Sequence, residues 1–188
     1  MTTKILKGAF AITLIFTTLA FTIMNKDINI KDSTVVWKGK KITGSHTGTI
    51  QFSSGTLQLE DDTIIGGEFV IDMTSINVTD LTGESKGKLE GHLKSDDFFG
   101  VNNFPTSKLL ITSAEKTSEG HYVTADLTIK DITEPVNFVL NLNEDTATTS
   151  LKIDRTKYGV RYGSGSFFDN LGDNTISDNF ELDVTLKF

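Results

Sequence analysis

The nine residues from Phe180 to Phe188 constrain the fold of this chain more than any other segment. They read Phe-Glu-Leu-Asp-Val-Thr-Leu-Lys-Phe, a strict alternation of large apolar and polar side chains. Successive side chains of a β-strand point to opposite faces, so this pattern predicts a strand with one buried and one solvent-facing side. The backbone groups of such a strand need partners, and the strand must therefore belong to a sheet.

The same alternation recurs along the chain. Segments that show it are residues 46–52, 68–73, 123–130 and 136–142. Gly, Asn and Asp residues separate these segments, and short alternating strands with such punctuation predict an antiparallel sandwich or barrel. Gly66-Gly67 predicts a bulge or sharp bend, which barrels use to curve. Ser53-Ser54-Gly55 predicts a hairpin loop between two strands.

Residues 74–105 interrupt the strand pattern. Leu89, His92 and Leu93 recur at helical spacing within residues 86–94, and Ser85 precedes them as a candidate N-cap. These features predict one short helix. Further along, residues 158–171 are rich in glycine and aromatic side chains, and we expect a long loop there, near one end of the sheet structure.

The first 24 residues differ from the rest of the chain. Lys4 and Lys7 give a basic start, and the 17 residues from Gly8 to Met24 carry no charge. This layout predicts a helical leader over residues 1–24, either a secretory signal peptide or an uncleaved membrane anchor, since about 17 residues is the lower limit for a membrane span. Both alternatives predict an exported protein, periplasmic or secreted.

Composition excludes several classes of function. The chain has no Cys, which rules out disulfides, thiolate metal sites and a Cys nucleophile. Its formal net charge of −7 argues against nucleic acid as a partner. The three His residues lie at positions 46, 92 and 121, without the spacing of metal ligands, so no metal or other cofactor is expected. The 13 Phe residues suit a large core or an apolar cavity equally well.

An ordered set of segments carries a family resemblance. The segments are Trp37–Lys41, Gly67–Met73, Leu89–Phe99, Phe104–Thr106, Leu127–Lys130 and Asp154–Val160. In this order and at this spacing, they make the chain from about Ser33 onward similar to the YceI-like family of exported lipid-binding proteins. The run from His92 to Phe99 is the most specific of them. Ala125 and Asp131 depart from the family pattern, which usually has Gly at both positions.

The resemblance implies an all-β fold over residues 28–188, an eight-stranded antiparallel lipocalin-like barrel with one short helix. It also implies an elongated apolar lumen that holds a polyisoprenoid or similar long amphipathic lipid. Strand alternation then places a set of side chains on the inner face. The expected lumen residues are Trp37, Ile50, Phe52, Phe69, Ile71, Phe99, Leu127, Phe138, Leu140, Leu182 and Val184.

Polar residues near the mouth of the lumen are candidates to meet the lipid head group. These are His92, Arg155 and Tyr158. For Arg155 the pattern leaves two interpretations open, a phosphate clamp or a structural ion pair at a strand end. His92 can likewise contact a ligand or pack under the barrel rim.

The leading hypothesis is a non-enzymatic carrier or store for one lipid. The alternatives are a structural barrel with a filled core and, less favoured, an enzyme acting on such a lipid. An enzyme needs a convergent nucleophile and base, and the sequence offers none. A homodimer is compatible with the sequence, which does not fix the oligomeric state.

Overall fold

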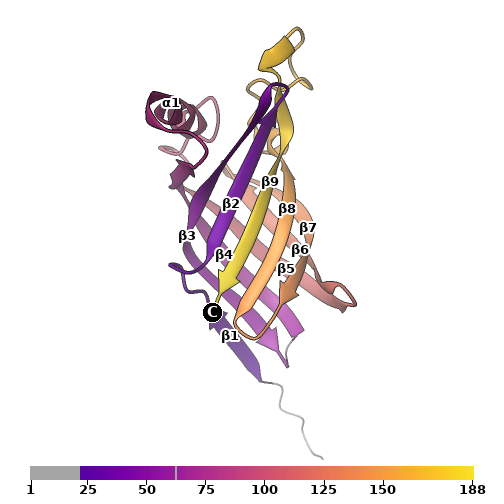
Figure 1. The fold of residues 1–188 in the computed structure, drawn as a ribbon. Coiled ribbons are helices and arrows are strands. Elements are labelled where there is room, and N and C mark those ends of the chain that lie inside the picture. Colours follow the sequence, from indigo (N-terminus) through magenta and orange to yellow (C-terminus); the bar gives the residue numbers. More distant parts are fainter. Residues whose placement is uncertain (1–21, 62) are drawn as a thin grey trace, which may run out of the picture.

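The computed structural model of this protein describes residues 22–61 and 63–188, which form a closed antiparallel barrel with one added strand and one α-helix (Figure 1). The eight barrel strands are β2 (Thr34–Lys41), β3 (Gly44–Glu60), β4 (Thr63–Val78), β5 (Thr106–Thr117), β6 (Gly120–Ile129), β7 (Ile132–Leu142), β8 (Thr146–Asp154) and β9 (Ile176–Lys187). The remaining elements are β1 (Ile23–Asp27), α1 (Gly83–Lys94) and the 3-10 helices η1 (Arg155–Tyr158) and η2 (Gly172–Asn174).

The last strand closes the barrel. Each strand from β2 to β9 pairs with its neighbour in the chain, and β9 also pairs with β2. Leu182 of β9 lies opposite Trp37 on one side and Leu151 on the other. The apolar residues of β9 thus face inward together with those of both neighbours. The predicted fold class, an all-β eight-stranded antiparallel barrel with one short helix, is confirmed.

Strand β3 is longer than the sequence indicated, and the predicted hairpin at Ser53–Gly55 is wrong. The strand continues through these residues, with a register shift against β4 between Phe52 and Ser54 that bends it. A Cβ on Gly55 would lie 2.6 Å from the Phe69 ring, so glycine serves close packing here rather than a turn. The predicted irregularity near Gly66 is confirmed, since Ile65 is the extra residue of a bulge.

One end of the barrel is covered by β1 and by the residues that connect it to β2. Strand β1 pairs with Thr56–Glu60 of β3, and the following residues cross to the start of β2. Ile28 is buried, and the Asn29 amide donates a 2.6 Å hydrogen bond to the Lys187 carbonyl oxygen. The sequence pattern did not predict strand β1. This segment closes the end of the barrel at which β9 finishes.

The predicted leader lies almost wholly outside the described residues, which begin at residue 22. Ile23 and Met24, which were included in the predicted leader, belong to strand β1. Within the part of the chain that the structure describes, none of the helices combines the length and the apolar character that crossing a membrane requires.

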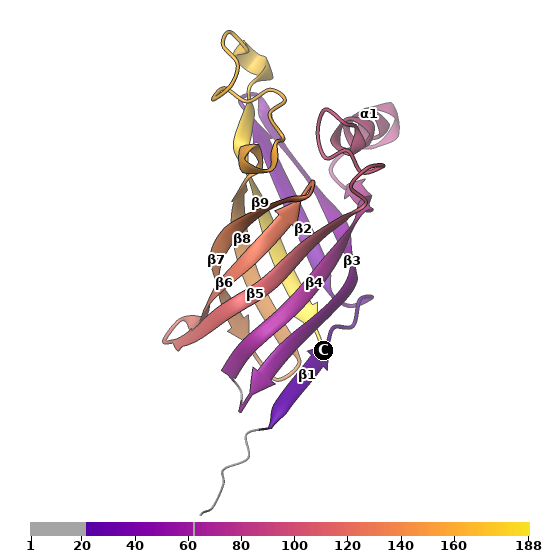
Figure 2. The ribbon, with the colours of Figure 1, turned by 180° about the vertical axis from the view of Figure 1, so that it is seen from behind.

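Helix α1 lies at the other end of the barrel, where the loops after η1 also project (Figures 1 and 2). It begins after Thr82 rather than Ser85, and its N-cap side chain makes no capping hydrogen bond. None of its residues is fully buried. The Glu90 carboxylate accepts a 2.8 Å hydrogen bond from the Val78 amide and thereby ties the helix to β4.

The wall of the barrel is least complete between β7 and β8. These strands pair only at Asn141–Thr148 and Leu142–Ala147. Every other neighbouring pair in the barrel has at least six paired positions. Beyond the two pairs the strands diverge around a polar pocket, and we call this part of the wall the β7–β8 seam.

Candidate ligand-binding cavity

The interior of the barrel contains an elongated, almost wholly apolar cavity of about 260 Å³. Side chains from all eight barrel strands and from α1 line it. Its volume is near the lower end of the roughly 300–1,000 Å³ typical of small-molecule sites. The cavity therefore suits a slender ligand better than a bulky one.

The structure brings together thirteen of the fourteen predicted site residues around this cavity. They are Trp37, Ile50, Phe52, Phe69, Ile71, His92, Phe99, Leu127, Phe138, Leu140, Arg155, Leu182 and Val184. The exception is Tyr158, which is buried and lines the polar pocket of the β7–β8 seam instead. Tyr158 ends the 3-10 helix η1 that begins at Arg155, and both residues are buried.

Several lining residues were missing from the sequence prediction. They include Met73, Ile76, Leu89, Leu93, Phe98, Leu109, Ile111, Ile129, Leu151, Phe180 and Leu186, along with the polar Ser107 and Thr149. Alternation was enough to find some of them, because Ile129 and Leu186 share a face with Leu127 and Val184. Met73 continues the alternation of Phe69 and Ile71, whereas no local pattern indicated Ile76, because a register shift interrupts β4 beside it.

An aromatic layer lines the cavity beside helix α1. Phe98 and Phe99 meet edge to face with ring centroids 5.1 Å apart, and Phe99 meets Phe180 of β9 at 6.3 Å. His92 extends the layer, 5.5 Å from the Phe98 ring. These contacts bring the segment after α1 onto the barrel, even though the helix itself buries little.

The exposure of the lining residues locates the mouth of the cavity. At the α1 end the lining includes the exposed Lys40 and Lys41 and the half-buried Leu89. At the opposite end it ends on the buried Val35 and Leu186. The cavity therefore opens between the β2–β3 hairpin and α1, and is closed where Ile28 crosses the barrel.

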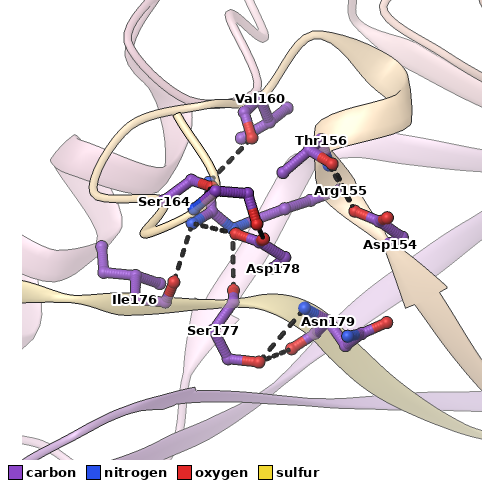
Figure 3. Close-up of polar contacts among 10 residues, drawn as sticks. Asp154, Arg155, Thr156, Val160, Ser164, Ile176, Ser177, Asp178 and Asn179 are labelled. Atoms are coloured by element: carbon purple, nitrogen blue, oxygen red, sulfur yellow. Dashed lines mark hydrogen bonds and ion pairs between the residues drawn. The ribbon is translucent and has the colours of Figure 1, made fainter. Parts of the chain in front are cut away.

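Arg155 connects η1 to the following loop and to the start of β9 (Figure 3). Its side chain is only 2 % exposed and donates hydrogen bonds to three backbone carbonyls, those of Val160 (2.7 Å), Ser177 (2.9 Å) and Ile176 (3.1 Å). Asp178 supplies a carboxylate 3.7 Å from the guanidinium. These carbonyls take three of the five guanidinium N–H donors, and Asp178 supplies a counter-charge, so the geometry favours the structural interpretation of Arg155 over the phosphate clamp.

The ionisation of this cluster follows from burial and charge. Burial lowers the pKa of Arg155, and the carboxylates of Asp178 and Asp154 oppose that effect. For Asp178, burial alone would raise the pKa, but hydrogen bonds from the Ser164 and Ser166 side chains and the charge of Arg155 outweigh it and lower the pKa. A charged pair thus persists at neutral pH.

Two polar side chains of the lining have atoms without partners. The Nε2 atom of His92 and the Oγ1 atom of Thr149 are buried and make no hydrogen bond to the described residues. His92 lies at the mouth, against Phe98 and Tyr162, and Thr149 lies deeper, opposite Val184. A ligand with a polar group at either level would find a hydrogen-bond partner there.

His46, one of the three His residues considered as metal ligands, makes a local contact. The Nδ1 atom of His46 lies 3.0 Å from Asp80. Burial would raise the pKa of Asp80, but hydrogen bonds from His46 and from the backbone outweigh it and lower the pKa. Across residues 22–61 and 63–188, no three His, Asp or Glu side chains gather closely enough to hold a metal ion.

Comparison with known proteins agrees with this geometry. Residues 27–188 match the YceI-like domain. The UPF0312 protein plu2095 of Photorhabdus laumondii is 40% identical over 45 residues, which are 24% of this chain and 23% of that relative. The aligned stretch thus spans less than a quarter of the relative.

Two solved structures share the fold at low sequence identity. BcnA of Burkholderia cenocepacia superimposes with a TM-score of 0.67 at 19% identity, covering 85% of this chain and 98% of BcnA. A polyisoprenoid binding domain of Saccharophagus degradans, described as implicated in plant cell wall breakdown, gives 0.57 at 15% identity, covering 88% and 97%. Because the domain match spans residues 27–188, the chain belongs to the YceI-like family.

Proposed function

We propose that this protein binds one long-chain amphipathic lipid, of the polyisoprenoid class, and carries or stores it without chemical change. The observation that carries the proposal is the elongated apolar cavity inside the barrel, with exposed lining residues at the α1 end. The fold relative from Saccharophagus degradans, described as a polyisoprenoid binding domain, supports this class of ligand.

Burial of the tail is sufficient for useful affinity. A ligand of about 30 heavy atoms that gains about 0.3 kcal/mol per atom binds with about 9 kcal/mol, or a Kd on the order of 0.1–1 μM. One hydrogen bond to a head group adds only about 0.5–1.5 kcal/mol. His92 and Thr149 would then orient the lipid rather than supply most of the affinity.

The described polar groups favour binding over catalysis. The Arg155 guanidinium is committed to backbone carbonyls, and the Ser166 hydroxyl donates to Asp178. Ser164 is fully buried and its Oγ accepts from the Ser166 amide. No nucleophile with a neighbouring base faces the cavity among these groups, as an enzyme acting on the lipid would require.

We also propose that the protein acts outside the cytoplasm. The support is the basic start and the uncharged run at residues 8–24. Intact mass after expression in a bacterial host tests this proposal. A mass that lacks the leader supports export with cleavage, and an uncleaved chain in the membrane fraction supports the anchor.

Identification of the co-purified ligand tests the binding function. Native mass spectrometry of the purified protein should show an added mass, and extraction should release an apolar chain. Leu140→Trp and Val184→Trp, which narrow the lumen, should lose most of this ligand. Leu110→Trp adds the same side chain to the exposed outer face of β5 and should keep it.

The polar variant His92→Ala should retain most of the ligand. If His92→Ala empties the protein while both lumen variants stay loaded, head-group recognition dominates and the tail-burial mechanism is wrong. If no variant, nor the wild type, ever carries or takes up a lipid, the filled-core alternative replaces the proposal.

A further inference from the structure

Exposed aromatic side chains are concentrated in one loop beside the cavity mouth. Tyr162, Phe167 and Phe168 are 49%, 46% and 51% exposed, and they fall within seven residues of each other. Among the described residues, Tyr122 is the one other aromatic side chain with comparable exposure, at 46%. Single exposed apolar residues are ordinary, but a cluster of large ones indicates a contact surface.

The β2–β3 hairpin adds a fourth apolar side chain to the same end of the molecule. Ile42 at its turn is 68% exposed, and its amide donates a 3.2 Å hydrogen bond to the Thr175 carbonyl oxygen. The hairpin and the loop after η1 reach the same end of the barrel in both views (Figures 1 and 2). We call Ile42, Tyr162, Phe167 and Phe168 the aromatic tip.

The tip is connected to the cavity. The Tyr162 ring lies 4.5 Å from the ring of His92, which lines the mouth. The hairpin that carries Ile42 also supplies the lining residues Lys40 and Lys41. A surface bound to the tip would therefore face the cavity opening.

The charges around the tip balance, whereas the whole chain has a net charge of −7. The turn of the hairpin and the loop carry Lys40, Lys41 and Arg161 against Asp169 and Asp173, and Lys40 is paired with Glu181 of β9. The Arg161 guanidinium stacks 4.5 Å from the Phe167 ring. Aromatic rings with a cation beside them suit the boundary between lipid head groups and acyl chains.

We propose that the aromatic tip docks the protein on a zwitterionic phospholipid bilayer, with the cavity mouth turned toward the lipid. This inference rests on the proposed function, because a lipid cargo has to be taken from or delivered to a membrane. Phe167 and Phe168 enter the interface, and Ile42 follows on the other side of the opening. Apolar insertion is the main driving force, so binding depends little on salt or on anionic lipid.

A local probe tests the docking independently of residues 1–21. The chain has no Cys, so Asp169→Cys takes a single polarity-sensitive dye beside Phe168. Ser118→Cys places the same dye in the exposed β5–β6 turn, which lies away from α1 and the tip in both views (Figures 1 and 2). Phosphatidylcholine vesicles that contain doxyl-labelled lipid should shift and quench the dye at position 169 and leave the dye at position 118 unchanged.

Substitutions in the dye-labelled Asp169→Cys protein test whether the response depends on the aromatic tip or arises from nonspecific adsorption to the vesicles. Phe167→Ser with Phe168→Ser should raise the vesicle concentration for half response at least tenfold. Ile42→Ser is a second, independent tip variant and should weaken the response in the same direction. Tyr122→Ser removes an equally exposed aromatic from β6 and should leave the response unchanged.

Three results would overturn the docking proposal. They are equal responses at positions 169 and 118, a response that survives both tip variants, and a dye shift that appears with rising protein concentration in the absence of vesicles. The last result would assign the tip to a contact between two copies of the chain. Cargo retention, measured separately by native mass spectrometry, tests the lipid-binding function whatever the vesicle result.

Discussion

The Trp37 indole lies across Gly48, its cross-strand partner on β3. A Cβ at position 48 would come within 2.4 Å of the ring and within 2.0 Å of the Asn77 carbonyl oxygen on β4. The close approach of three strands at this point sets the position of the ring that lines the cavity beside its mouth. Trp37 is also the only Trp of the chain, so its fluorescence reports on the cavity.

Gly48→Ala should destabilise the protein by about 1–3 kcal/mol, because the ring and the β4 backbone must both move to accommodate a methyl group. The Trp37 emission spectrum of the folded variant should also change. Gly39→Ala on β2 is the matched control, since a Cβ there would meet nothing within 4 Å. Urea midpoints and emission spectra compare the two. Equal urea midpoints for the two variants would mean that the strands around Gly48 move apart for the methyl group at little cost in stability.

Strand alternation was enough to predict the inner face of the barrel, because side-chain direction in a strand has a strict period of two. Phe138 and Leu140, like Leu182 and Val184, line the cavity as the pattern indicated. The same rule could not reveal β1, whose residues are mostly exposed and resemble the end of the leader. It also failed at Gly55, where a bend inside a long strand has the composition of a turn.

The roles of polar residues depended on contacts that no local pattern contains. The partners of Arg155 are backbone carbonyls, brought to it by a loop that returns 21 and 22 residues later. A backbone carbonyl has no sequence signature, so an Arg that binds carbonyls could not be distinguished from an Arg that binds a ligand. Tyr158 was misplaced for a related reason, since the pocket of the seam that it lines arises from the separation of β7 and β8, which no local pattern indicates.

Arg155→Met should cost about 3–5 kcal/mol in the free energy of unfolding. The substitution leaves three carbonyls without donors and leaves the part-buried Asp178 carboxylate without its counter-charge. Arg161→Met changes an exposed Arg of the neighbouring loop and should cost at most about 0.5 kcal/mol. Chemical denaturation measures both. If the two variants unfold alike, the Arg155 cluster is not a structural centre and the phosphate-clamp interpretation regains support.

Tyr158 should make the protein sensitive to alkali. Burial, with added repulsion from the charges of Glu134 and Asp154, raises the pKa of its hydroxyl to about 12. The fold thus prefers the neutral phenol, and this stabilisation is complete below pH 10 and lost as the pH rises toward 12. Two pKa units correspond to about 2–3 kcal/mol. Tyr158→Phe should remove this component of the alkaline loss, and Tyr122→Phe, at an exposed site, should not.

The β7–β8 seam should be the most mobile part of the barrel wall. Beyond Asn141–Thr148, the amides of β7 and β8 that face each other lack interstrand partners. Such amides exchange through local fluctuations rather than through global unfolding. Hydrogen exchange should therefore be faster for the seam-facing amides of residues 136–139 than for amides in the fully paired β5–β6 hairpin.

Engineered cysteine pairs test the separation of the strands at defined positions of the seam. The chain has no native Cys that would interfere. Asn141 and Thr148 are directly paired, so a cysteine pair there should oxidise readily. Continuing that register would place Asn137 opposite Lys152, but both border the pocket that separates the strands. A pair at 137 and 152 should therefore cross-link slowly, and only as the wall fluctuates. Rapid cross-linking at both sites, with uniform amide protection, would mean that the strands close in solution. In the structure Leu151 lines both the pocket of the seam and the cavity. Closure of the strands would remove the pocket and leave Leu151 lining the cavity alone.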